Sequence, residues 1–104
     1  MTKLLVAAVA IAAAAPAATA PHHFYVVVID NLKFGALPTD PRVGDMIVWR
    51  NRDMFRHSAT ARDGSFDTDL PANGMGKTML TKSGTIRFYC KYHPGMTGAF
   101  TVRK

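Results

Sequence analysis

The stretch Thr85-Ile86-Arg87-Phe88-Tyr89-Cys90-Lys91-Tyr92-His93-Pro94-Gly95-Met96 decides how this chain folds. Its first half alternates in polarity, so that every second residue, ending with Cys90, faces the core side of a predicted β-strand. Pro94-Gly95 then predicts a tight turn before a further strand over residues 97–103. The Cys90 thiol is therefore expected at the end of a strand, on the core side.

The rest of the chain consists of short apolar runs separated by Gly, Pro, Asn and Asp, with no long segment of helical period. Residues 24–29 predict a buried strand, because they are β-branched and aromatic. Residues 62–73 are rich in Asp, Gly and Pro and predict a loop, in which Asp67 and Asp69 are solvated. Further strands are expected over 46–50, 57–61 and 75–81, and a loop or irregular edge over 34–41. This pattern predicts an all-β, Greek-key β-sandwich of about seven to eight short strands.

Four side chains with soft or imidazole donors fall into a regular pattern. Cys90, His93 and Met96 follow one another at intervals of three residues, and His57 begins a predicted strand upstream. A thiolate and a thioether select copper among the metals a cell handles, and two imidazoles, one thiolate and a weak thioether form the ligand set of blue-copper electron-transfer sites. The sequence therefore predicts one copper ion held by His57, Cys90, His93 and Met96.

The first twenty residues have the features of a secretion signal. Lys3 supplies a positive charge, an apolar run begins at Leu4, and small residues follow it. Cleavage is expected after Ala17 or Ala20, which leaves a single domain over residues 21–104. The apolar stretch is short and Ala-rich, so we expect export to the periplasm without stable membrane insertion.

Charge and composition limit the partners. Without Lys3, twelve Lys and Arg residues stand against seven Asp and no Glu, a net charge of +5. This surplus suits a partner with an acidic docking surface, whereas the export signal and the lack of a dense basic run argue against nucleic acid. No triad, open coordination position or substrate-cleft pattern indicates an enzyme, and we expect a monomer.

From residue 43 to 102 the chain resembles the small cupredoxins of the plastocyanin/amicyanin family. The resemblance rests on four stretches: Gly44-Asp45-Met46-Ile47-Val48-Trp49-Arg50-Asn51-Arg52-Asp53, His57-Ser58-Ala59-Thr60-Ala61, Gly64-Ser65-Phe66-Asp67, and residues 89–98. The two-residue gaps on both sides of His93 are similar to amicyanin, whereas plastocyanin and pseudoazurin have a longer gap before Met.

The resemblance implies His57, Cys90 and His93 as strong equatorial ligands of a type 1 copper ion and Met96 as the axial one. It also implies that the His93 ring edge is exposed through an apolar patch and passes single electrons between larger redox proteins. The amicyanin-like spacing suggests a c-type cytochrome and an amine dehydrogenase as partners. Ser58 is expected to lock the two ligand loops and to offer its backbone N–H to the Cys90 sulfur.

Two other functions fit the same residues. A periplasmic copper-binding or delivery protein would carry the metal rather than electrons, and an adhesion or structural sandwich would bind no metal. An intense blue colour on adding Cu(II) would indicate the electron carrier. A colourless, bound Cu(I) species would indicate the delivery protein, and a lack of copper binding would indicate the structural protein.

Two features depart from the resemblance. Arg56 stands where many relatives place Pro before the first ligand, and with neighbouring arginines it is expected to form a basic region that steers an acidic partner. His22 and His23 follow the predicted cleavage region. If the mature chain starts at Pro21, His23 becomes its third residue. Cu(II) could then be chelated by the terminal amine, backbone amides and the His23 imidazole. The alternative is that these residues form a flexible terminus without a metal.

Overall fold

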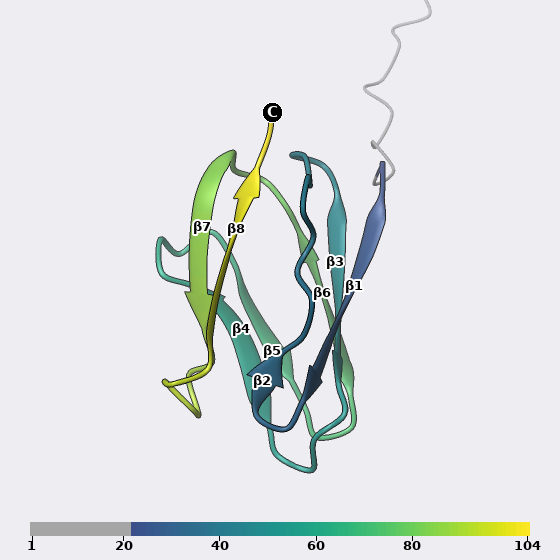
Figure 1. Cartoon of the computed structure of the whole chain (residues 1–104), viewed down its shortest axis with the longest axis vertical. Coiled ribbons are helices and arrows are strands. Elements are labelled where there is room, and N and C mark those ends of the chain that lie inside the picture. Colours follow the sequence, from purple (N-terminus) through teal and green to yellow (C-terminus); the bar gives the residue numbers. More distant parts are fainter. Residues whose placement is uncertain (1–21) are drawn as a thin grey trace, which may run out of the picture.

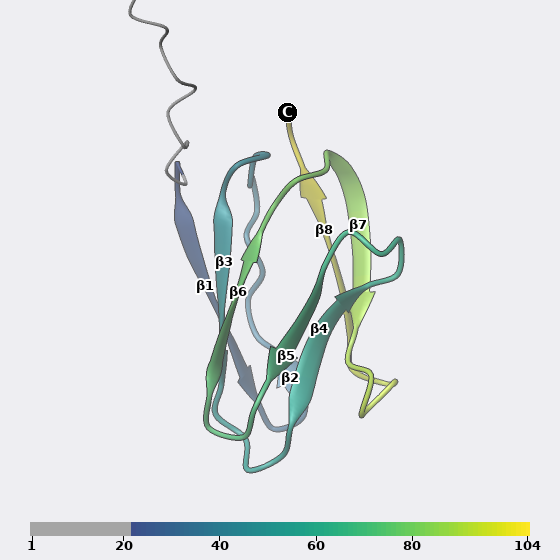
Figure 2. The same cartoon turned by 180° about the vertical axis from the view of Figure 1, so that it is seen from behind.

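Two four-stranded β-sheets pack face to face in the computed structural model, which describes residues 22–104 (Figure 1, Figure 2). The strand orders are β2-β1-β3-β6 in one sheet and β5-β4-β7-β8 in the other. The strands are β1 (Phe24–Asp30), β2 (Lys33–Phe34), β3 (Met46–Asn51), β4 (His57–Ala61), β5 (Asp67–Leu70), β6 (Met75–Met79), β7 (Gly84–Tyr89) and β8 (Thr97–Val102). The prediction of an all-β sandwich of seven to eight strands is confirmed.

The first sheet buries one face only. Its β1 pairs in parallel with β3, and β3 pairs antiparallel with β6. Val27 and Ile29 of β1 are fully buried, but Phe24 and Val26 are each 61% exposed on the opposite face. The expectation of a buried strand over residues 24–29 is therefore right for alternate residues and wrong for the others, because within residues 22–104 no layer covers the outer face of this sheet.

The core between the sheets is built on aromatic side chains. Trp49 of β3 and Phe88 of β7 meet edge to face with ring centroids 5.3 Å apart, and both are fully buried. Gly98 of β8 lies directly against the Phe88 ring, where a β-carbon would stand 2.4 Å from a ring atom. This close contact holds β7 and β8, and so the two ends of the loop between them.

The interpretation of residues 62–73 as a loop is wrong in its second half. Residues Asp67–Leu70 form β5, which pairs antiparallel with β4 from His57↔Leu70 to Thr60↔Asp67. Only Leu70 is buried, so the segment carries little apolar signal. Backbone pairing with β4 and polar contacts of its side chains hold it in the sheet, and tertiary context thus overrides weak strand propensity.

The two ends of the sandwich carry different features. The loop between β7 and β8 lies at the lower end of Figure 1, whereas β1 begins and the chain ends at the upper end.

The predicted signal peptide, residues 1–20 with cleavage after 17 or 20, lies outside the described residues. Within residues 22–104 there is no helix with the length and apolar character that a bilayer crossing requires.

Candidate metal centre

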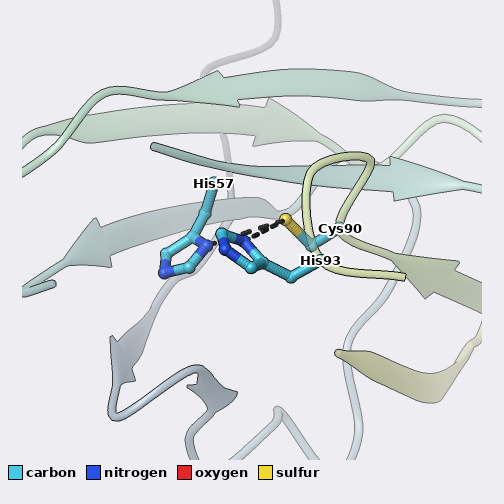
Figure 3. Close-up of side chains that lie close together, drawn as sticks. All are labelled: His57, Cys90 and His93. Atoms are coloured by element: carbon cyan, nitrogen blue, oxygen red, sulfur yellow. Dashed lines mark hydrogen bonds between the residues drawn. The ribbon is translucent and has the colours of Figure 1, made fainter. Parts of the chain in front are cut away.

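Three predicted ligands converge (Figure 3), at the end of the sandwich that carries the β7–β8 loop. His57 is the first residue of β4, Cys90 follows the last residue of β7, and His93 lies in the loop before β8. The Cys90 Sγ atom lies 3.7 Å from His57 Nδ1 and 3.8 Å from His93 Nδ1. The three donor atoms lie within 4.8 Å of one another, and theirs is the only such group among residues 22–104.

These separations fit a shared metal ion. With metal–sulfur and metal–nitrogen bonds of about 2.3 and 2.05 Å, a trigonal angle of about 120° places sulfur and nitrogen about 3.8 Å apart. The distances from Cys90 Sγ to the two imidazole nitrogens are 3.7 and 3.8 Å. Figure 3 marks both contacts as hydrogen bonds to the sulfur, and the same separations match those of two ligands on one metal ion.

The backbone of Met96, the fourth predicted ligand, is hydrogen-bonded to Cys90 and His93. Its side chain is 5% exposed, and its backbone closes the loop, because Cys90 N–H donates to Met96 O at 3.0 Å and Met96 N–H donates to His93 O at 2.8 Å. These two bonds form the turn that Pro94-Gly95 predicts. The axial role of the Met96 sulfur stays a prediction.

The three donors differ in exposure. His57 and Cys90 are fully buried, whereas His93 is half-buried. The Phe55 ring packs edge-on against His93 at 6.1 Å between centroids, and Phe55 is itself 58% exposed. Exposed Met54 and Tyr92 lie beside Phe55 and His93 in the sequence. His93 is thus the most exposed of the three donors, and the apolar Phe55 ring lies against it.

Asp53 fixes the His57 ring. Its Oδ2 atom lies 2.8 Å from His57 Nε2, and its two oxygens also accept hydrogen bonds from Asn31 and Leu32 N–H. Burial alone would raise the pKa of the Asp53 carboxyl, but the hydrogen bonds from Leu32, His57 and Asn31 outweigh it and lower this pKa below its ordinary value. An ionised Asp53 can only accept a hydrogen bond, so it keeps the His57 proton on Nε2 and leaves the lone pair of Nδ1 facing Cys90.

Asn51 holds the segment that carries Asp53. Its side chain is buried, and the amide Nδ2 donates to the backbone oxygens of Phe55, Leu70 and Pro71. Its Oδ1 atom accepts the Asp53 N–H at 2.9 Å. One amide therefore ties the turn before His57 to the end of β5.

Ser58 links the two ligand segments. Its backbone N–H donates to Cys90 Sγ at 3.4 Å, and its hydroxyl accepts the Lys91 N–H at 2.9 Å. Both contacts were expected from the resemblance and are present. The hydroxyl lies 2.9 Å from Thr60 Oγ1, which donates to Asp67 Oδ1 at 2.8 Å, so the hydrogen bonds run in one direction from Lys91 N–H to a carboxylate.

The two carboxylates of β5 are ion-paired, which corrects their interpretation as solvated loop residues. Asp67 accepts Lys91 Nζ at 3.0 Å, and Asp69 accepts two hydrogen bonds from the Arg56 guanidinium at 2.8 and 2.9 Å. Hydrogen bonds from Arg56 lower the pKa of Asp69, and those from Lys91 and Thr60 lower the pKa of Asp67.

Each of these cations adjoins a predicted ligand in the sequence. Arg56 precedes His57, and Lys91 follows Cys90. Arg56 also lies 5.4 Å from the centre of the Tyr92 ring, so it bridges β5 and the ligand loop. The bidentate pair with Asp69 compensates the Arg56 charge, which weakens the expectation that Arg56 itself steers an acidic partner.

Sequence reasoning missed Asp53 and Asn51 as functional residues. The i, i+4 spacing of Asp53 and His57 was a usable signal, because a histidine ligand commonly donates its second ring N–H to a carboxylate. Asn51 gave no such signal, since its three carbonyl partners come together only in the folded chain.

Solved structures of amicyanin share this fold. A mutant in its reduced Cu(I) form at pH 4 superposes with a TM-score of 0.67 at 25% identity, over 76% of this chain and 81% of that chain. A second mutant in the reduced state gives 0.66 at 25% identity, and an oxidized mutant gives 0.66 at 24% identity, both over the same shares. No family model and no curated protein matches the sequence. The chain therefore has an amicyanin-like cupredoxin fold, with a His-Cys-His group suited to one copper ion.

Proposed function

We propose that this protein with an amicyanin-like fold is a type 1 copper electron carrier of the periplasm. The observation that carries the proposal is the placement of Cys90 Sγ at 3.7 and 3.8 Å from the Nδ1 atoms of a buried and a half-buried histidine. Copper in such a site supplies reversible one-electron chemistry between Cu(II) and Cu(I). The residues proposed to hold it are His57, Cys90, His93 and Met96.

The surrounding contacts favour electron transfer because they keep the donors in place. Asp53 orients His57, Ser58 N–H orients the Cys90 sulfur, and the bonds between Cys90 and Met96 backbones close the loop. A site that changes little between two oxidation states adds little reorganisation to each electron transfer. Support from hydrogen bonds outside the ligand set is what such a site requires.

The half-buried His93 is proposed as the route of the electron. The Phe55 ring, which is 58% exposed, packs against the His93 ring. An apolar surface suits brief contact with another redox protein, since it sheds water readily and forms few directional bonds. The surplus of basic residues favours partners with acidic docking surfaces, such as a c-type cytochrome or an amine dehydrogenase.

The electron self-exchange rate between the Cu(I) and Cu(II) forms of the copper-loaded protein tests this route without a partner. Phe55→Glu should slow self-exchange by at least tenfold, because it places charge beside His93. Phe24→Glu is the matched control, because Phe24 is 61% exposed on the outer face of the first sheet. It should leave the rate within threefold of the wild-type value. Equal effects of the two variants would reject His93 as the route, and a protein that binds only colourless Cu(I) would support copper delivery instead.

A further inference from the structure

A surface cavity of about 550 Å³ lies at the end of the sandwich opposite the β7–β8 loop, where β1 and β3 begin. His22, His23, Tyr25, Asp40, Arg42 and Asp45 line it. The proposed electron transfer involves only the opposite end, where the copper centre lies. The cavity combines two imidazoles with two carboxylates, which is a donor set for metal ions.

Asp45 lies fully buried beneath this cavity with one oxygen unsatisfied. Its Oδ2 atom accepts the Arg42 N–H at 2.8 Å, but its Oδ1 atom is buried and has no hydrogen-bond partner. The backbone on both sides is fixed, because Asp45 N–H donates to Arg42 O and Leu80 N–H donates to Asp45 O. A buried, unsatisfied carboxylate oxygen is costly, so its position calls for a cation.

His23 is placed to share such a cation with Asp45. Its Nδ1 atom lies 3.6 Å from Asp45 Oδ1, which is too long for a good hydrogen bond. Two ligands of one tetrahedral metal ion, each at about 2.1 Å, stand about 3.4 Å apart. The observed separation is close to that value, and the His23 side chain is 68% exposed, so a metal ion can reach it from solvent.

His22 offers a third donor at the rim. Its Nδ1 atom would lie 4.0 Å from a β-carbon on Gly44, so the absence of a side chain there leaves the ring room to move. It is not already gathered with the other two, and it must rotate to complete the set. Of the other lining groups, Asp40 is already paired with Arg103 at 2.8 Å. Burial and the charge of the nearby Asp45 raise the pKa of Tyr25, so the Tyr25 hydroxyl lies close to Asp45 and a metal ion there would displace it.

We propose that His23, Asp45 and His22 form a second metal site, separate from the copper centre, for a borderline divalent ion such as Zn²⁺ or Cu²⁺. Imidazole and carboxylate donors with solvent as the remaining ligand suit these ions, and the absence of a thiolate makes the site less selective for copper than the Cys90 centre. The protein would then bind two metal ions of different chemistry at its two ends.

Calorimetric titration of the copper-loaded, ascorbate-reduced protein with Zn²⁺ tests this proposal, because copper blocks the first site. We expect one further equivalent of Zn²⁺ to bind, and Zn²⁺ to shift the His22 and His23 ring signals in NMR spectra of the diamagnetic Cu(I) form. His23→Gln and Asp45→Asn should each weaken Zn²⁺ binding at least tenfold. Asp40→Asn, a carboxylate change in the same cavity, should change it less than threefold.

Acetylation of the terminal amine separates this site from chelation by the chain terminus. Binding that survives acetylation and falls with Asp45→Asn supports the cavity site. Binding that is lost on acetylation, or that is unchanged in Asp45→Asn, overturns it, as does the absence of a second equivalent in the wild-type protein. His23→Gln alters an exposed side chain, so it remains informative if Asp45→Asn lowers stability.

Discussion

The Asp53 carboxylate lies 2.8 Å from Nε2 of His57 and so determines which nitrogen of that ring faces Cys90. The aspartate stands four residues before the histidine, in a turn that Asn51 holds against the end of β5. A buried imidazole could otherwise adopt either tautomer. The contact therefore prepares His57 Nδ1 as a metal donor before any metal arrives.

Asp53→Asn is predicted to weaken copper binding by about 10- to 100-fold, since the amide cannot hold the His57 tautomer as a carboxylate does. Competition with a chelator of known affinity measures the change. Asp63→Asn serves as control and should bind copper like the wild type, because Asp63 lies past the opposite end of β4 from His57 and contacts Ser65 and Lys82 rather than a ligand. Equal affinity of Asp53→Asn and Asp63→Asn would show that Asp53 does not orient the ligand.

Ser58→Ala is predicted to destabilise the protein by about 1–3 kcal/mol, because it leaves the part-buried Lys91 N–H without an acceptor. The visible spectrum of the copper form should change little, because the backbone N–H to the Cys90 sulfur remains. Thr85→Ala removes an exposed hydroxyl pair with Thr101 and should cost less than about 0.5 kcal/mol. Urea unfolding of both variants measures the difference, and equal losses would contradict a linking role for the Ser58 hydroxyl.

Gly98→Ala is predicted to destabilise the fold by about 1–3 kcal/mol or more, because its methyl group would stand 2.4 Å from the buried Phe88 ring. Gly95→Ala in the ligand loop is the control, since a β-carbon there meets no atom within 4 Å. Thermal unfolding of the two variants should separate them clearly. If Gly98→Ala unfolds at the wild-type temperature, the packing between β7 and β8 is looser than the structure shows.

Arg56→Gln is predicted to raise the pKa of Asp69, because hydrogen bonds from Arg56 are the main cause of its lowered value. The folded-state pKa of Asp69 lies below the unfolded value near 3.9, so the pair stabilises above about pH 4 and its contribution is lost as pH falls through the lowered pKa. Arg56→Gln should therefore flatten the loss of stability in that acid range. NMR titration of the Asp69 carboxyl carbon measures the pKa directly, with Arg103→Gln, which affects Asp40, as the control. An unchanged Asp69 pKa would contradict the pairing.

The sequence predicted those parts of the fold that depend on local pattern. The alternation ending at Cys90 identified β7, and the following Pro94-Gly95 identified the turn. The sequence pattern did not identify β5, because Asp67 and Asp69 resemble loop residues. Their ion-pair partners Lys91 and Arg56 come beside them only in the folded chain. Ion pairs between residues in different parts of the chain cannot be predicted from the periodicity of polar and apolar residues.

The metal site also combines features that local sequence pattern predicts with features that depend on the folded chain. The spacing of Cys90 and His93 and the position of His57 were sufficient to predict three converging donors. Asp53 escaped notice because orienting a ring depends on tautomer and distance, which residue spacing only suggests. The unsatisfied oxygen of Asp45 is invisible in sequence altogether, because burial of one carboxylate atom is a property of the folded chain.

Optical titration of the metal-free protein with Cu(II) is the most direct test of a type 1 copper site at Cys90. One equivalent of Cu(II) is expected to produce an intense blue sulfur-to-copper absorption. Ascorbate should remove the colour, an oxidant should restore it, and Cys90→Ser should abolish it. Failure of Cu(II) to produce the blue absorption, with tight binding of colourless Cu(I) alone or with no copper bound, would contradict a type 1 copper site.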